Sequence, residues 1–311
     1  MITVLMAVYN GEKYLREQLD SILSQQGLEK GQLRIIVSDD NSADSSRKII
    51  QEYARHFPEQ VFPVFRKTSS GSAQEHFLSL LSQEEDEYIM LSDQDDVWLP
   101  EKVELLLRKM REMEERYGKE MPILVHSDMK VADEALETIS GSYFRYQKIS
   151  PERASLPQLL VQNNVTGGAT MVNHAMLPFF KQIPSVCLMH DNWMALLAAS
   201  FGKIGWVDKP LYLYRQHGNN SLGARKADTI EEAAKRVWDG SQAEENYRRM
   251  FAQAQCLLQM YEDRLDEEQK EILRAFISLP GQRRLGKIKT MIKYGFTKNS
   301  MKRTLGQMLF M

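Results

Sequence analysis

The first 130 residues alternate short apolar runs with stretches of helical periodicity, and this alternation limits the possible folds more than any other feature. Apolar runs with the length of buried strands cover residues 2–8, 33–37, 61–65, 88–91 and 123–126. Helical patterns lie between them, over residues 14–23, 74–81 and 100–117, and one further pattern after the second strand ends at residue 53. Strands that alternate with helices form a mostly parallel sheet with helices on both faces. The sequence therefore predicts an α/β fold.

Polar clusters follow four of these five strands. They read YNGE, SDDNS, SDQDD and HSD, after the first, second, fourth and fifth strand. In open α/β sheets, ligands bind at the carboxyl ends of the strands. We therefore expect one polar cleft along that edge of the sheet.

The cluster SDQDD places Asp93, Asp95 and Asp96 within four positions. Carboxylates this close repel one another unless a cation or hydrogen bonds compensate. A hard divalent metal ion prefers oxygen ligands and often shares them with substrate phosphates. The residues alone also allow a solvated acidic turn in which Asp96 caps the helix that follows Pro100.

Composition places the chain among globular proteins. It has 311 residues, of which 43% are hydrophobic and 26% charged. No apolar run approaches the roughly 20 residues of a membrane-spanning helix, and the first residues lack the layout of a signal peptide. Cys187 and Cys256 are too far apart for a metal-binding pair. We therefore expect a reduced, cytoplasmic setting.

The pattern changes after about residue 141. NNVTGGATMV indicates a glycine-containing turn before a strand, and HDNWMALLAASFG indicates a helix that starts near Asp191. GWVDKPLYLYRQHGNN predicts two short strands around Pro210 and then a polar loop. Beyond Thr229 the chain is helical and charged, so we place a boundary near residue 225. One apolar stripe of this helical part contains Tyr247, Met250, Phe251, Ala254, Leu258 and Tyr261.

Several segments together resemble the family 2 glycosyltransferases. They read MAVYNGEKYLREQLDSILSQ, IIVSDDNSADSS, YIMLSDQDDVWLPEKVE, HDNWMALLA and YRQHGNN. The resemblance covers about residues 1–225 and is strongest to the bacterial rhamnosyltransferase branch, in which SDQDDVW and a YRQHG-type ending occur together. It implies a GT-A fold with a donor half at about residues 1–128 and an acceptor half at about 129–225. Residues 226–311 would then form a helical extension with a basic amphipathic tail.

The same resemblance implies an inverting transfer from a nucleotide-diphospho-sugar to a glycan or lipid-linked acceptor in bacterial cell-wall or surface polysaccharide synthesis. The rhamnosyltransferase branch implies dTDP-β-L-rhamnose as the donor. The alternatives are a UDP-hexose or UDP-N-acetylhexosamine transferase of the same fold, and a non-catalytic scaffold that binds nucleotide sugars.

By resemblance, the metal site contains Asp95, Asp93 and His217. Asp95 contacts the ion, Asp93 serves both the ion and the donor ribose or sugar, and Asp96 supports them. The implied cofactor is Mn²⁺ or Mg²⁺, and a neutral imidazole suits Mn²⁺ better. A single loop histidine such as His217 is otherwise simply solvated.

The resemblance also assigns residues to the nucleotide sugar. Asp39 and Asp40 correspond to the contacts with base and ribose, and an acidic acceptor at that point favours a pyrimidine. Asn41 or Ser42 offers the alternative of an ordinary helix cap. The other assigned residues are the backbone of Ala7, Val8 and Tyr9, the side chains of Arg66 and Arg215, and Gly168 in TGGA.

Two positions depart from the family pattern. After Arg66, Gly71 keeps its register, but His76 stands where relatives have asparagine. Asp191 matches the general base that deprotonates the acceptor hydroxyl, yet His190 replaces the usual glutamate before it. His190 is therefore a second candidate for the base or for an acceptor contact, and Asp191 is also suited to cap its helix.

Charge is distributed unevenly along the chain. Residues 279–311 contain eight Lys and Arg and no Asp or Glu, whereas residues 1–278 contain 32 Lys and Arg against 42 Asp and Glu. A basic amphipathic helix binds an anionic membrane surface, here the inner face of the plasma membrane. The alternative is packing on the acidic body or on a partner subunit. We do not expect nucleic-acid binding, because no recognised module is present and the body is acidic.

Overall fold

The structure is a computed structural model that describes residues 1–218 and 240–310, and the boundary expected near residue 225 lies outside them. The described residues group into two compact units. Unit 1 contains residues 1–143, 165–183 and 202–218, and unit 2 contains residues 144–164, 184–201 and 240–310.

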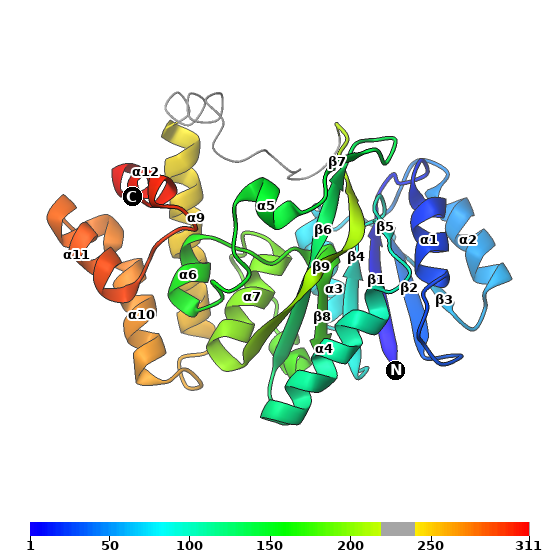
Figure 1. Cartoon of the computed structure of the whole chain (residues 1–311), viewed down its shortest axis with the longest axis horizontal. Coiled ribbons are helices and arrows are strands. Elements are labelled where there is room, and N and C mark those ends of the chain that lie inside the picture. The colour runs from blue at the N-terminus through cyan, green and yellow to red at the C-terminus, as the bar shows by residue number, and fades with distance from the viewer. Residues whose placement is uncertain (219–239, 311) are drawn as a thin grey trace. The chain divides into compact units, whose positions relative to one another are not determined.

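Unit 1 is built on one sheet, which has nine strands within the described residues (Figure 1). Its order is β3 (Val61–Phe65), β2 (Leu33–Asp39), β1 (Ile2–Val8), β4 (Tyr88–Ser92), β8 (Thr170–Asn173), β6 (Ile123–Ala132), β9 (Lys203–Arg215) and β5 (Val97–Trp98), with β7 (Thr138–Ser140) paired to β6. The first four strands are parallel, whereas β8 runs antiparallel to both β4 and β6. The predicted α/β fold is confirmed.

Helices cover both faces of this sheet. Helices α1 (Leu15–Leu23), α2 (Ser46–His56) and α4 (Lys102–Tyr117) share one hydrophobic core with alternate residues of β1 and β2. Helix α3 (Ala73–Leu81) also packs against β1. Because β1 is buried along its length, its near-continuous apolar sequence is typical of a strand between two layers of helices.

Two strand predictions were wrong in extent. Residues 203–215 form the single strand β9 rather than two short strands around Pro210. The pairing with β6 shifts register next to Pro210, and such a bulge accommodates a residue without an N–H group. Strand β6 continues to Ala132, so HSD at residues 126–128 lies buried inside the strand and not at its end.

Unit 2 is helical. It contains α6 (Leu156–Val161), α7 (His190–Phe201), α9 (Gly240–Met260), α10 (Glu267–Ile277), α11 (Arg284–Tyr294), α12 (Met301–Phe310) and most of α5 (Tyr143–Gln147). Helix α6 packs on α7, α9 and α10, and α9 also contacts α10 and α12. Of the predicted stripe, Tyr247, Ala254, Leu258 and Tyr261 are buried. The sequence did not indicate that residues 144–164 and 184–201 group with the C-terminal helices.

The basic tail forms two helices instead of one. Gly295 ends α11 in the left-handed conformation (φ 74°), which glycine adopts without strain, and α12 begins six residues later. Among the described helices, none is both long enough and apolar enough to cross a lipid bilayer.

Candidate active site

The carboxyl ends of β1, β2, β3 and β4 meet at one edge of the sheet. The parallel register pairs Val8 with Asp39, Asp39 with Phe65, and Met6 with Ser92. The loops after β1 and β4 are joined there, because Gln94 Oε1 accepts a hydrogen bond from the Tyr9 N–H at 2.8 Å. The clusters YNGE, SDDNS and SDQDD therefore begin at the same edge, as their spacing predicted.

Asp95 and His217 contact each other directly. His217 Nε2 lies 2.7 Å from Asp95 Oδ2, although 122 positions separate the residues. The ring of Tyr14 stacks on His217 with 5.0 Å between centroids. Two residues that the family resemblance assigned to the metal site are thus brought together at the end of β9.

The side chains at this position suit a metal ion that binds few protein ligands. No group of three or more His, Cys, Asp or Glu side chains within the described part of the chain lies close enough to enclose an ion. Mg²⁺ is usually bound by one or two carboxylates and completes its shell with water and substrate phosphates. The Asp95–His217 pair supplies one carboxylate and one imidazole nitrogen, which is compatible with that mode and with Mn²⁺.

Asp93 and Asp96 both approach Gly168. This glycine lies in the 3₁₀ turn Gly167–Ala169, and a Cβ atom added to it would lie 3.5 Å from Asp93 Oδ2, Asp96 Oδ2 and the Tyr212 hydroxyl. Two carboxylates therefore converge on this glycine, at distances that would be ordinary van der Waals contacts for a Cβ atom. The Asp96 Oδ1 atom accepts a hydrogen bond from the Arg215 N–H at 3.1 Å, whereas its buried Oδ2 has no hydrogen-bond partner among the described residues.

Lys102 is a buried cation that the sequence analysis missed. Its Nζ donates to the Gly168 carbonyl at 2.5 Å and lies 3.6 Å and 4.3 Å from the ring centroids of Trp98 and Tyr212. Burial lowers the pKa of Lys102 and raises that of Asp96, while their opposite charges act in the other direction. One signal was available in the sequence: Lys102 opens α4, and the dipole of a helix disfavours a cation at its N-terminus.

Arg215 is buried and its guanidinium is engaged within unit 1. Nε donates to the Asp95 carbonyl at 2.7 Å, Nη1 donates to the Glu134 carbonyl at 2.7 Å, and Nη2 pairs with the carboxylate of Glu17. The guanidinium also lies 4.6 Å from the ring of Tyr14. These contacts hold the Asp95 segment against the end of β9, and a contact between Arg215 and a diphosphate stays a prediction.

Asp40 is held as an ionised acceptor. Its carboxylate accepts hydrogen bonds from the Ser70 N–H at 2.8 Å, the Ser70 hydroxyl at 2.7 Å and the Ser69 hydroxyl at 2.8 Å. Burial opposes ionisation, but these hydrogen bonds outweigh it and lower the pKa of Asp40 below its ordinary value. Arg66 Nε lies 3.1 Å from Asp40 Oδ1, so in this structure Arg66 pairs with the carboxylate.

Asp39 is fully buried and pairs with Arg47, whose Nε lies 2.6 Å from Asp39 Oδ2. His76, the residue that departs from the family pattern, is also buried, and its Nε2 lies 2.7 Å from the Ser38 hydroxyl. Burial lowers the pKa of His76, so it is neutral at pH 7. Asp39 and Asp40 are therefore both buried and both engaged by neighbouring groups, and a contact of either one with a nucleotide stays a prediction.

The predicted segment at Ala7, Val8 and Tyr9 ends β1. The Val8 carbonyl accepts the Asp40 N–H at 2.8 Å, which joins this segment to the aspartate loop. The Tyr9 side chain is 57% exposed, which is unusual for an aromatic residue that follows a buried strand. Its role toward a nucleotide stays a prediction.

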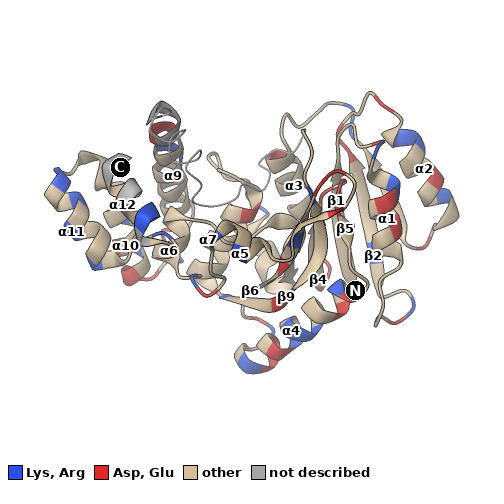
Figure 2. Ribbon diagram, turned by 45° about the horizontal axis from the view of Figure 1, so that its top comes forward, with Lys and Arg blue, Asp and Glu red and all other residues tan. Residues whose placement is uncertain are grey.

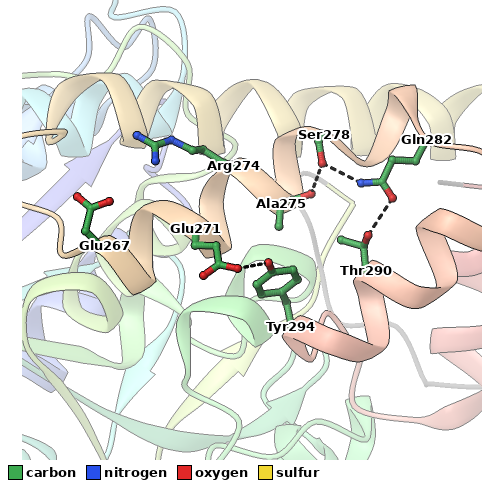
Figure 3. A pocket seen from close by; sticks show the side chains of 8 residues that line it. All are labelled: Glu267, Glu271, Arg274, Ala275, Ser278, Gln282, Thr290 and Tyr294. Atoms are coloured by element: carbon green, nitrogen blue, oxygen red, sulfur yellow. Dashed lines mark hydrogen bonds between the residues drawn. The ribbon is translucent and has the colours of Figure 1, made fainter.

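Asp191 belongs to unit 2, where it lies in the first turn of α7. Asn163 Nδ2 donates a hydrogen bond to Asp191 Oδ1 at 3.2 Å, and the first turn of a helix is a favourable position for an acidic side chain. His190 is buried, and burial lowers its pKa to about 3, so it is neutral at pH 7. A separate open groove of unit 2 lies between α10 and α11 and contains none of the predicted site residues (Figure 3).

The first part of the chain is similar to a known protein family. The family model described as glycosyl transferase family 2 matches residues 3–118. Residues 3–118 therefore carry a family 2 glycosyltransferase domain, and the predicted family is confirmed for this part of the chain.

Curated relatives extend beyond this domain. A dTDP-rhamnosyl transferase, RfbG, of Shigella flexneri is 28% identical over 234 residues, which cover 70% of this chain and 74% of the relative. The putative teichuronic acid biosynthesis glycosyltransferase TuaG of Bacillus subtilis is 25% identical over 76% of this chain and 86% of its own length. An uncharacterized protein of Mycobacterium tuberculosis is 25% identical over 70% of this chain, and the match spans only 59% of that relative.

Solved structures show the same fold at low sequence identity. Residues 1–349 of Staphylococcus aureus TarS in complex with UDP-GlcNAc align with a TM-score of 0.60 and 17% identity, over 94% of this chain and 73% of that fragment. The mannosyltransferase PcManGT of Pyrobaculum calidifontis, in complex with GDP-Man and Mn²⁺, aligns with a TM-score of 0.56 and 14% identity, over 94% of this chain and 73% of that one. The predicted GT-A fold is confirmed by these likenesses.

Proposed function

We propose that the protein is an inverting, metal-dependent glycosyltransferase that uses dTDP-L-rhamnose and acts in bacterial cell-wall or surface polysaccharide synthesis. The observation that carries this proposal is the carboxylate cluster at the end of β4, in which Asp95 meets His217 at 2.7 Å. The choice of sugar is supported by the similarity to a dTDP-rhamnosyl transferase. A UDP-hexose or UDP-N-acetylhexosamine is the alternative donor.

The donor end of the site would bind the nucleotide and its diphosphate. Asp40, ionised and oriented by Ser69 and Ser70, would accept the N3–H of a thymine or uracil. Asp95, Asp93 and His217 would hold Mn²⁺ or Mg²⁺. The ion would offset the negative charge that develops on the departing diphosphate.

Asp191 would act as the general base. Inversion requires a carboxylate to remove the proton from the acceptor hydroxyl as the oxygen attacks the anomeric carbon. The hydrogen bond from Asn163 and the position in the first turn of α7 would keep Asp191 ionised, ready to accept that proton.

The basic helix α11 would bring the enzyme to the inner face of the plasma membrane, where lipid-linked acceptors are found. Figure 2 shows Lys and Arg along α11 without Asp or Glu. Leu285 and Ile292 on this helix are 76% and 67% exposed. Exposed apolar side chains among cations are typical of helices that bind anionic lipid surfaces.

The experiment combines donor binding with transfer. Nucleotide sugars linked to dTDP and UDP are screened by calorimetry with Mn²⁺ present, and hydrolysis of the bound donor is followed in the same samples. Asp191→Asn should bind the donor with nearly unchanged affinity yet lose turnover. Asp95→Ala should weaken donor binding and its metal dependence together, and Asp208→Asn, an exposed carboxylate on β9, serves as the matched control.

The outcomes separate the proposals. Loss of donor binding in Asp191→Asn would show that the residue is not the base. A protein that binds the nucleotide sugar but never turns it over, even with polysaccharide acceptors added, would be the non-catalytic scaffold. Preference for a UDP-linked sugar would mean that the donor is not dTDP-L-rhamnose, and it would leave the proposed mechanism unchanged.

A further inference from the structure

Gln253 of helix α9 lies against the turn that carries Asp191. Its side chain is only 2% exposed. Oε1 accepts a hydrogen bond from the Leu188 N–H at 2.7 Å, and Nε2 donates to Asn192 Oδ1 at 2.6 Å. The amide of Gln253 therefore bonds to residues on both sides of the pair His190–Asp191. Leu188 lies two positions before the pair, and Asn192 follows it.

The orientation of this amide is determined by its partners. The backbone N–H of Leu188 can only donate, so the Gln253 atom that faces it is the oxygen. The amino group is then directed at Asn192. The contact with Asn192 is buried and the contact with Leu188 is partly buried. Loss of a buried hydrogen bond leaves a polar group without a partner, at a cost of about 1–3 kcal/mol. The bridge therefore fixes the loop before α7 relative to its first turn.

A second amide acts on the carboxylate itself. Asn163, which follows α6, donates to Asp191 Oδ1 at 3.2 Å. Helix α6 packs against both α7 and α9, so these elements form one packed group within unit 2. Asn163 thus contacts Asp191 directly, whereas Gln253 contacts only the residues around it.

We propose that Gln253 is a positioning residue for the general base, which makes α9 part of the catalytic apparatus. This inference rests on the proposed function of Asp191. A base must lie within hydrogen-bond reach of the hydroxyl it deprotonates, and a displacement of about 1 Å costs roughly 100-fold in rate. The bridge would prevent such a displacement when the acceptor binds.

The test compares two buried substitutions on the same helix. Gln253→Met keeps the approximate volume and removes both hydrogen bonds. Leu257→Ala removes a fully buried apolar side chain one turn later, which destabilises the fold but removes no hydrogen bond to the Asp191 turn. Both variants are assayed at a temperature where circular dichroism shows them folded, with kcat, donor KM and half-saturating Mn²⁺ measured separately.

We expect Gln253→Met to lower kcat about 10- to 100-fold while donor KM and the Mn²⁺ requirement stay at wild-type values. Leu257→Ala should lower the melting temperature yet retain kcat. Gln253→Glu should recover part of the turnover, because burial beside Asp191 favours the protonated acid, whose carbonyl oxygen accepts from the Leu188 N–H and whose hydroxyl donates to Asn192 Oδ1. Recovery by the conservative variant would not follow from loss of packing alone.

Three results would overturn the inference. They are an unchanged kcat in folded Gln253→Met, an equal loss of kcat in Leu257→Ala, or a rise in donor KM at constant kcat. If the wild-type protein transfers sugar and Asp191→Asn does not, any of these results refutes only the role of Gln253. A wild-type protein without transfer activity refutes the proposed function, and the role of Gln253 with it.

Discussion

Replacement of Lys102 by methionine should destabilise the protein far more than the loss of an ordinary lysine. Lys102 and Asp96 are both fully buried, and the positive charge of Lys102 acts to lower the pKa of Asp96, although no hydrogen bond or salt bridge joins the two side chains in the described part of the chain. Loss of one of two opposite buried charges leaves the other without compensation, which costs about 3–5 kcal/mol when the two are in direct contact. Part of that cost is avoidable here, since burial and the neighbouring Asp95 and Asp93 already raise the pKa of Asp96 and favour uptake of a proton. We therefore expect a loss of about 3 kcal/mol, at the lower end of that range.

The free energy of unfolding is measured in urea at pH 7 for four proteins: wild type, Lys102→Met, the double variant Lys102→Met/Asp96→Asn, and Lys209→Met. Lys209 is half exposed and pairs with Glu101 at 2.7 Å, so its loss should cost less than about 1 kcal/mol. The double variant removes both charges and should recover at least half of the stability lost in Lys102→Met. A cost for Lys102→Met no larger than that of Lys209→Met, or a double variant less stable than the single one, would refute the reasoning.

Three further predictions concern other parts of unit 1. His217→Ala should raise the Mn²⁺ concentration needed for half-maximal donor binding about 10-fold, because His217 contacts Asp95; an unchanged Mn²⁺ titration would remove it from the metal site. Gly202→Ala should lower the melting temperature sharply, because its Cβ would lie 1.9 Å from the Pro122 carbonyl oxygen, and a wild-type melting curve would contradict this. Burial lowers the pKa of His126 to about 4, whereas its value in the unfolded chain is near 6.5. Between pH 6.5 and pH 4 the unfolded state therefore binds more protons than the folded state, and the free energy of unfolding falls by up to about 3 kcal/mol as the pH falls. In His126→Gln, the free energy of unfolding measured in urea should differ less between pH 7 and pH 4.5 than in the wild type. An equally large difference would show that other groups cause it.

Much of the donor half was predictable from the sequence because its signals are local. The strands at residues 2–8 and 61–65 were identified with their observed bounds, since each is a short run of apolar residues, although only the first is buried along its length. The polar clusters after β1, β2 and β4 were placed at one edge because parallel strands align their carboxyl ends. The pairing of Asp95 with His217 was foreseen only through family resemblance, since nothing local connects residues 122 positions apart.

Other features depended on the tertiary structure. Whether residues 203–215 form one strand or two was decided by a register shift in β6, which the sequence around Pro210 does not encode. The environment of Lys102 was decided by Trp98 and Tyr212, because a lysine becomes a buried cation only where other elements supply aromatic faces and a carboxylate.

By itself, then, the sequence determined the order of strands and helices in the donor half, the acidic cluster and the family, since each depends on residues that are neighbours in the chain. The tertiary structure alone decided which polar groups form hydrogen bonds to the predicted site residues and to their neighbours. Gln253 shows why: its amide reaches Leu188 and Asn192 across more than 60 positions, and only packing between α9 and its neighbours brings those atoms within hydrogen-bond distance.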